Sequence, residues 1–275
     1  ITDCANTANV TGKSSVGGIT GNSGSFARML TYNSINEGNV TGESNVGGVV
    51  GYGGASHSVN KGAITGAKEN IGGISGFSEG NIEYSCNLGA IKADKAKNVG
   101  GVIGNGNAIG SFSYECSSTG KAVVPGAKAA VGEGKSDNSF YCTGPEESAI
   151  TRGFRNAISF LSGPADTTPV QSKEEQAKTP EQFASGEVAY LMDNSNSTRT
   201  ENWGQKLGQD NYPVFADSDH LPIYAAIGNN QSSGLVTVNG KQVHYGEKGS
   251  TVSVSASASN GYEFISLYVN GKAYS

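Results

Sequence analysis

The sequence repeats a short box four times, in which two adjacent glycines are flanked by apolar residues. The boxes start 30, 25 and 28 residues apart, and each is followed two residues later by one more glycine. They read Val16-Gly17-Gly18-Ile19 with Gly21, Val46-Gly47-Gly48-Val49 with Gly51, Ile71-Gly72-Gly73-Ile74 with Gly76, and Val99-Gly100-Gly101-Val102 with Gly104. Self-similarity at such a period is the signature of a stacked repeat array. The pattern therefore predicts an elongated, regular fold.

Two further columns keep step with the boxes. An apolar-Thr-Gly triplet stands six to eight residues before each box: Val10-Thr11-Gly12, Val40-Thr41-Gly42, Ile64-Thr65-Gly66 and the altered Ile91-Lys92-Ala93. Four residues before each triplet there is an asparagine: Asn6, Asn36, Asn60 and Asn87. In a fifth turn we expect Ser117 to take the place of the asparagine. The residues just before this column are Ala5, Ile35, Val59, Cys86 and Cys116.

Short strand-like segments separated by glycine and asparagine predict an all-β fold, a parallel β-solenoid (β-helix) of about five coils over residues 1–144. In such a fold equivalent residues stack about 4.8 Å apart. We expect the Val10 column to point inward and the asparagines to adopt the left-handed conformation at a corner, with their amides bonded to neighbouring turns. Val46 and Val49 are three residues apart, and a flat strand cannot place both side chains on one face. We therefore expect a bulge or corner at the glycines between them.

The unit from Asn36 to Tyr52, NEGNVTGESNVGGVVGY, resembles the GLUG repeat. That family recurs in bacterial surface proteins, in adhesins, and beside the peptidase domain of some immunoglobulin A proteases. The resemblance covers residues 1–134 and implies an adhesin-like role. It carries over no catalytic motif, because GLUG repeats have none.

Residues 145–227 read as a mixed helix and loop segment that caps the open edge of the last coil. Thr179-Pro180-Glu181-Gln182 predicts a helix start, with a Thr cap, a Pro in the first turn and a Gln at the capping-box position. A break is expected near Ser185-Gly186, and turns at Ser162-Gly163-Pro164 and Pro169. The segment resembles one commonly found after such repeats in gut-bacterial surface proteins.

The remainder predicts a linker at residues 228–234, which are rich in Gly, Asn and Ser. Residues 235–275 then read as part of a small β-module, with strands at 235–238, 251–258 and 262–269 and Asn-Gly turns at Asn239-Gly240 and Asn270-Gly271. This part resembles the start of an internalin B-repeat. Since the chain also opens inside a repeat, we expect it to be a fragment of a larger protein.

Composition narrows the functional classes. The net charge of −5 and the absence of a basic stripe argue against nucleic-acid binding. The sequence contains no run of 18 apolar residues, so no segment is predicted to insert into a membrane. A charged fraction of only 16% with abundant Gly, Ser, Thr and Asn is typical of extracellular or cell-wall-attached bacterial proteins. The cysteines, at spacings that match no metal or dithiol motif, read as small buried side chains, with a structural disulfide as the alternative: Cys4, Cys86, Cys116 and Cys142.

Several motifs suggest chemistry, but their context favours a structural role. The GxSxG of residues 76–80 lies between predicted solenoid strands, whereas a nucleophile elbow needs a strand-turn-helix. The glycine-rich residues 104–110 depart from GxGxxG and precede no helix. With only His57, His220 and His244 there is no HExxH. Residues 193–196 lack the glycine and glutamate of an EF-hand, so a helix-ending turn is expected. Glu79, Glu83 and Glu115 are the carboxylates that could approach each other near one face, although charged surface residues usually only keep a face solvated.

We therefore expect a non-enzymatic adhesion or spacer segment, with no catalytic residues, cofactor or metal. A glycan or host protein is the expected partner, and the loop aromatics Tyr32, Tyr52, Phe77 and Tyr84 are the candidates for contacting it. The first alternative is the non-catalytic arm of a larger secreted protease or glycosidase. The second is a β-helix polysaccharide lyase or hydrolase, which would need paired carboxylates on one face.

Overall fold

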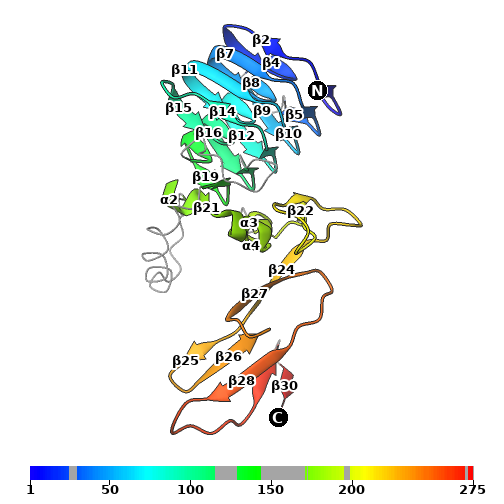
Figure 1. Cartoon of the computed structure of the whole chain (residues 1–275), viewed down its shortest axis with the longest axis vertical. Helices are drawn as coiled ribbons and strands as arrows, with labels where there is room; N and C mark the ends of the chain where they lie inside the picture. Colours follow the sequence, from blue (N-terminus) through cyan, green and yellow to red (C-terminus); the bar gives the residue numbers. More distant parts are fainter. Residues whose placement is uncertain are drawn as a thin grey trace.

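The structure is a computed structural model that describes residues 1–24, 30–114, 129–143, 171, 173–194, 199–269 and 272–274. These residues form a parallel β-solenoid of about four turns, a segment with short helices, and a small antiparallel β-module, arranged one after another along the longest axis (Figure 1). The predicted fold class is confirmed.

Three parallel sheets run along the solenoid. The first contains β1 (Ala5–Asn6), β6 (Ile35–Asn36), β10 (Val59–Asn60), β13 (Cys86–Asn87), β17 (Phe112–Ser113), β20 (Phe140–Cys142) and β21 (Ala177–Lys178). The second contains β2 (Val10–Thr11), β3 (Ser14–Gly17), β7 (Val40–Gly47), β11 (Ile64–Gly72), β14 (Ile91–Lys92) and β15 (Lys97–Gly100). The third contains β4 (Thr20–Asn22), β5 (Leu30–Tyr32), β8 (Val50–Tyr52), β9 (Gly54–Ser56), β12 (Ser75–Glu83), β16 (Ile103–Ile109), β18 (Val131–Glu133) and β19 (Ser136–Asp137).

The four glycine boxes stack in register, as predicted. Val16 pairs with Val46, Val46 with Ile71, and Ile71 with Val99. The second and third sheets meet at each box, where β7 ends at Gly47 and β8 begins at Val50. The predicted corner at the glycines is therefore present.

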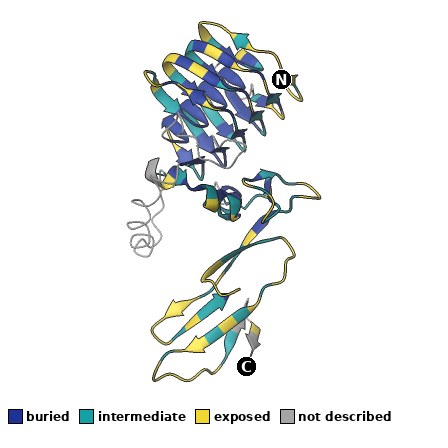
Figure 2. Ribbon diagram, viewed as in Figure 1, coloured by how far each residue is buried: buried dark blue, intermediate teal, exposed yellow. Residues whose placement is uncertain are grey.

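The predicted apolar column beside the threonines is also confirmed. Its members pair in sequence along the second sheet and pack in one buried cluster with Val16, Val46 and Ile71: Val10, Val40, Ile64 and Ile91. A second buried cluster includes Val49, Ile74 and Val102. Figure 2 shows these strands as the most deeply buried part of the molecule. Burying one such side chain contributes about 1.5–3 kcal/mol, so the repetition of these columns is what stabilises the array.

The asparagine column forms a hydrogen-bonded ladder inside the solenoid. Each Nδ2 donates both to the carbonyl two residues ahead and to the side chain of the next turn, along the series Asn6, Asn36, Asn60, Asn87 and Ser113. The expected bonding between turns is confirmed, but the expected left-handed conformation is wrong. That conformation occurs instead in two other columns. One stands just before the boxes, at Ser15, Asn45, Asn70 and Asn98, and the other three residues before the asparagine column and its continuation, at Asp3, Asn33, His57, Tyr84 and Asn138. The ladder asparagines lie within strands, so their backbone is extended.

The predicted fifth member of this ladder, Ser117 after Cys116, is also wrong. Ser113 pairs with Asn87, and Phe112 with Cys86. Residues 116 and 117 lie outside the described part of the chain. The error arose because Cys116 repeats Cys86 at a plausible spacing, whereas this turn takes only 26 residues.

A serine ladder that the sequence analysis missed runs beside the asparagines. Each backbone N–H in this column donates to the serine Oγ of the next turn, from Cys4 through Ser34, Ser58, Ser85 and Ser111 to Ser139. Cys4 replaces serine in the first turn, and its Sγ donates to Thr2 O as the serine hydroxyls do to the carbonyl two residues before them. A serine two residues before Asn36, Asn60 and Asn87 was the signal that could have revealed it.

The cap prediction is confirmed by the contacts at the end of the array. β21 adds a rung to the first sheet beside β20. In α2 (Lys173–Gln176), Gln176 Oε1 accepts hydrogen bonds from Ala130 N and Val131 N. One side chain thus satisfies two N–H groups that a further turn would otherwise have bonded.

Two short helices pack against the last rungs of the first sheet. α3 (Pro180–Ala184) begins with the predicted capping box between Thr179 and Gln182, and Gly186, with φ of 85°, separates it from α4 (Glu187–Met192). These helices and β22 (Trp203–Gly204), which pairs with β23 (Val214–Phe215), contribute to a third buried cluster. Trp203 Nε1 donates to Gly110 O at 2.8 Å, which fixes this segment to the solenoid. The predicted turns near residues 163 and 169 lie outside the described residues.

The boundary of the β-module differs from the prediction. β24 (Ile223–Ile227), expected in the cap, pairs with β27 (Val243–Glu247). The expected linker contains β25 (Asn230–Gln231), which pairs with β26 (Gly234–Val238). A stretch of Asn, Gln, Ser and Gly suits a hairpin turn as well as a linker, so composition alone misplaced the boundary.

The other strands of the module are shorter than predicted. β26 pairs on its other side with β28 (Val254–Ala258), and β29 (Leu267–Val269) pairs with β30 (Lys272–Tyr274). The Asn239-Gly240 turn is confirmed by positive φ at both residues. Asn270 and Gly271 are outside the described residues.

Candidate functional site

Two of the four predicted contact aromatics form a pair across neighbouring turns. Tyr52 of β8 and Phe77 of β12 are register partners, with ring centroids 5.1 Å apart and ring planes tilted by 36°. The Tyr52 hydroxyl donates to Glu79 Oε1 at 2.9 Å. Both rings are half-buried. Strand pairing and this hydrogen bond therefore hold two partly exposed aromatic side chains in a fixed arrangement, which we call the Tyr52–Phe77 pair.

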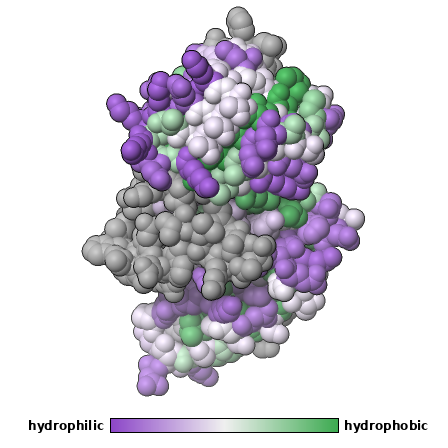
Figure 3. Space-filling view, turned by 45° about the horizontal axis from the view of Figure 1, so that its top comes forward, coloured by the Kyte–Doolittle hydropathy of each residue, from purple (hydrophilic) through white to green (hydrophobic). Residues whose placement is uncertain are grey.

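The same column is polar on both sides of the pair. Asn22 precedes Tyr52, and Asn105 and Glu133 follow Phe77, each in direct register. Amide and carboxylate groups beside aromatic rings can hydrogen-bond to a ligand whose apolar surface packs on the rings. On the face of the molecule that Figure 3 shows, hydrophobic residues likewise lie next to hydrophilic ones.

The other two aromatics, Tyr32 and Tyr84, lie on either side of His57, which the sequence analysis did not count among the contacts. The ring centroid of His57 is 5.2 Å from that of Tyr32 and 5.5 Å from that of Tyr84. His57 also contacts the cap, since its Nε2 lies 3.3 Å from Asn202 Oδ1 and its ring 5.9 Å from that of Phe215.

Within the group formed by Tyr32, His57 and Tyr84, the exposure of the aromatic side chains decreases toward the cap. Tyr32 is 44% exposed, whereas Tyr84 packs against the buried cluster beneath the cap. Burial, followed by the charge of Glu83, raises the pKa of the Tyr84 hydroxyl. Tyr84 therefore serves packing, and of this group Tyr32 is the residue most accessible to a partner.

The GxSxG motif lies within strand β12 rather than between two solenoid strands as predicted, so it is not part of a strand-turn-helix elbow. Ser78 is buried, and its Oγ accepts a hydrogen bond from Gly80 N. His220 is engaged elsewhere, with Nδ1 2.9 Å from Asp217 Oδ1, and His244 lies on β27. The glycine-rich stretch at 104–110 overlaps strand β16, so it also belongs to the solenoid rather than to a phosphate loop.

The predicted helix-ending turn is confirmed at Asp193, which directly follows α4. Residues 195 and 196 lie outside the residues that the structure describes. Asp193 Oδ1 accepts hydrogen bonds from Thr200, Asn202 and Trp203. Asp193 Oδ2 is buried without a hydrogen-bond partner. Burial accordingly raises the pKa of this carboxyl to about 6, against the effect of those hydrogen bonds. Its observed role is to organise the segment that carries Trp203.

The carboxylates considered for hydrolysis have partners within the solenoid. Glu79 accepts from Tyr52, and Glu83 Oε1 accepts from Asn81 Nδ2 at 3.4 Å. Glu115 is outside the described residues. Among the residues that the structure describes, no group of three or more His, Cys, Asp or Glu side chains is placed to hold a metal ion.

Cys86 behaves as the small buried side chain that the sequence predicted. It is an unpaired thiol in the cluster under the cap, and burial raises its pKa to about 12. Cys142 is buried in the same cluster, whereas Cys4 is half-exposed. No helix of the described chain is both long and apolar enough to cross a membrane.

In comparisons with known proteins, the chain matches no family model, no curated protein and no solved structure. The GLUG and internalin resemblances therefore remain predictions from the motifs alone.

Proposed function

We propose that this chain is a non-enzymatic adhesion or spacer segment of a bacterial surface protein, outside the cell or attached to the cell wall. In this proposal the Tyr52–Phe77 pair is the contact for a glycan or a host protein. The observation that carries it is the geometry of that pair. Its two rings are held at 5.1 Å on adjacent strands, with Glu79 fixed at the edge by the Tyr52 hydroxyl.

The architecture of the solenoid supports the same role. Its interior is cross-linked by asparagine and serine ladders, so a ligand-binding residue on its flank is displayed on a rigid support. A preorganised aromatic surface binds a partner with a smaller entropic cost than a flexible one. The resemblance of residues 36–52 to repeats of bacterial surface proteins points in the same direction.

The test uses the whole chain on arrays of glycans and of host extracellular proteins. The variants are the double substitution Tyr52→Ala/Phe77→Ala and, as control, Thr65→Ala, which removes an exposed side chain from the second sheet. We expect a binding signal that the double variant weakens at least about tenfold, a loss of about 1.4 kcal/mol, and that the control retains.

Two results would count against the contact. Equal binding by the wild type and the double variant would place the contact elsewhere on the molecule. Silence of the wild type on both arrays would leave only the spacer role. Circular dichroism of each variant should match the wild type, because both rings are only half-buried.

A further inference from the structure

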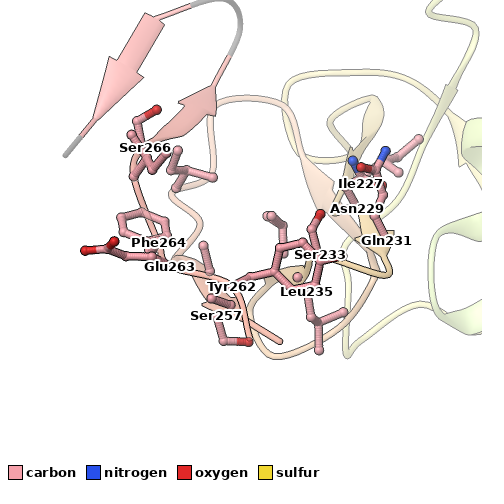
Figure 4. A pocket seen from close by; sticks show the side chains of 16 residues that line it. Ile227, Asn229, Gln231, Ser233, Leu235, Ser257, Tyr262, Glu263, Phe264 and Ser266 are labelled. Atoms are coloured by element: carbon pink, nitrogen blue, oxygen red, sulfur yellow. The ribbon is translucent and has the colours of Figure 1, made fainter. Parts of the chain in front are cut away.

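The β-module contains an open cleft of about 460 Å³, far along the chain from the Tyr52–Phe77 pair. Its floor is formed by β25, β26 and β28, and residues 262–267 form a wall. Figure 4 shows Phe264, Glu263 and Ser266 on one side, Ile227, Asn229 and Gln231 on the other, and Tyr262 near Ser233 and Leu235. A volume of this size lies within the range of about 300–1,000 Å³ that is usual for small-ligand sites.

The aromatic residues of the cleft are unusually accessible. Tyr262 is 56% exposed and Phe264 is 47% exposed. Ile265, which directly follows Phe264, is 83% exposed. Soluble proteins rarely leave large apolar side chains grouped in this way unless the group binds something.

The position of Tyr262 is fixed by the backbone. Tyr262 N donates to Ser259 O, and Ser259 N donates to Ser233 O at the tip of the β25–β26 hairpin. Gly261, with φ of 87°, allows the chain to turn there. The wall is therefore tied, at Tyr262, to the tip of the β25–β26 hairpin, which also lines the cleft.

The polar groups of the cleft define the ligand. Amide groups come from Asn229 and Gln231, hydroxyl groups from serines, and a carboxylate from Glu263. Among the described residues that line the cleft there is no Lys or Arg, so an anionic ligand would meet a carboxylate without a compensating cation there. A ligand with many neutral hydroxyl groups and an apolar face can satisfy these amides, hydroxyls and the carboxylate while packing on the rings.

We propose that this cleft is a saccharide-binding site that takes one or two neutral sugar units of a glycan, with Tyr262 and Phe264 as the stacking residues and Glu263, Asn229 and Gln231 as hydrogen-bonding residues. It is a second site, separate from the Tyr52–Phe77 pair. It shares the ligand class of the proposed function without depending on the contact proposed there.

The test is saturation-transfer-difference NMR with the full chain. The neutral probes are glucose, galactose, mannose, N-acetylglucosamine, cellobiose and lactose, and the anionic probe is N-acetylneuraminic acid. We expect transfer to at least one neutral probe, and at least a tenfold weaker affinity in Tyr262→Ala/Phe264→Ala. Tyr262→Phe should keep most of the binding because it keeps the ring, and N-acetylneuraminic acid should bind more weakly.

Variants elsewhere separate the two proposed sites. Thr65→Ala, at an exposed position of β11, should leave the transfer unchanged, and in Tyr52→Ala/Phe77→Ala the part of the transfer that depends on Tyr262 and Phe264 should remain. If Tyr52→Ala/Phe77→Ala abolishes transfer and Tyr262→Ala/Phe264→Ala does not, the cleft proposal fails and the solenoid contact stands. The substituted rings are exposed, so the double variant should remain folded, which the circular dichroism spectrum checks.

Two further outcomes would overturn the proposal. One is the absence of transfer to every neutral probe. The other is self-association through the cleft, seen as a doubled mass in light scattering that the cleft variant abolishes while no sugar competes. In that case the occupant would be a strand from a second copy of the chain.

Discussion

Gly48 of one turn lies directly against the Asn60 side chain of the next, so that a Cβ placed on Gly48 would overlap the Asn60 amide. The same relationship joins Gly18 to Asn36, Gly73 to Asn87 and Gly101 to Ser113. The second glycine of each box and the asparagine column, 12 to 18 residues further along the sequence, are therefore two parts of one contact. The glycine provides the space, and the amide fills it while bonding to the turns on both sides.

The first prediction tests this space. Gly48→Ala should destabilise the solenoid by about 3 kcal/mol or more, because both the amide ladder and the neighbouring Gly73 carbonyl block the added methyl group. Urea unfolding followed by far-ultraviolet circular dichroism measures the change. Gly80→Ala is the matched control in β12, where the nearest atom to a new Cβ lies 3.8 Å away, and it should change the stability by about 0.5 kcal/mol or less.

A double variant makes the same idea stricter. In Gly48→Ala/Asn60→Ala the obstructing amide is gone, so the combined cost should be clearly less than the sum of the two single substitutions. Strict additivity of the two costs would show that Gly48 is required for another reason. The contact between Gly48 and the Asn60 amide would then contribute nothing to the cost of Gly48→Ala.

The second prediction concerns the ladder itself. Asn60 is fully buried and accepts from Asn36 while donating to Asn87 and Gly62 O. Asn60→Ala should cost about 2–4 kcal/mol, because it removes one hydrogen-bond partner from buried polar groups in the turns on both sides and leaves a cavity where the amide was. Asn6→Ala, at the more exposed start of the ladder, should cost about 1 kcal/mol or less. Equal losses at the two positions in chemical denaturation would contradict the ladder model.

Sequence reasoning recovered the features that depend on spacing alone. The stacking of Val16, Val46, Ile71 and Val99 followed from the period, because residues at equivalent positions of a solenoid must lie in one column. The capping box at Thr179 followed equally well, since its bonds join residues only three apart.

Features that depend on chain path were missed. Whether Cys116 or Phe112 follows Cys86 in the column depends on the length of a turn, which similarity between cysteines cannot supply. The candidate contacts divided into two groups because Tyr52 and Phe77 share a register, whereas Tyr84 is covered by the cap. The cleft at Tyr262 was not predicted, because its walls come from strands and loops that are distant in sequence.

The third prediction tests how the array ends. Gln176 Oε1 accepts from Ala130 N and Val131 N, and Gln176 is buried. Gln176→Leu keeps the size of the side chain but leaves two buried N–H groups without acceptors, at a total cost of about 2–5 kcal/mol. The exposed strand edge should also promote aggregation on heating, which light scattering measures.

Gln209→Leu is the control for this substitution, because Gln209 is exposed in the cap. Its effect on stability should be about 0.5 kcal/mol or less. If the two leucine variants unfold and scatter light alike, Gln176 does not close the edge of β18.

The fourth prediction is a pH dependence of the cap. The pKa of Asp193 is raised to about 6 by burial, above its unfolded value of 3.8. Its proton is therefore bound more tightly in the folded protein, so this carboxyl adds stability that is complete below pH 3.8 and is lost as the pH rises through about 6. The change amounts to about 3 kcal/mol over that window.

The fluorescence of Trp203, the only tryptophan in the sequence, can report the unfolding of the cap at each pH. The backbone N–H of Trp203 donates to Asp193 Oδ1, and its ring centroid lies 5.1 Å from that of Phe112 and 5.0 Å from that of Phe215. Urea unfolding followed by Trp203 fluorescence should therefore show a stability difference between wild type and Asp193→Asn that shifts in favour of Asp193→Asn as the pH rises from 4 to 7. Asp219→Asn, at an exposed position, should track the wild type throughout. A wild-type to Asp193→Asn difference that stays constant with pH would mean that Asp193 does not titrate within the folded cap.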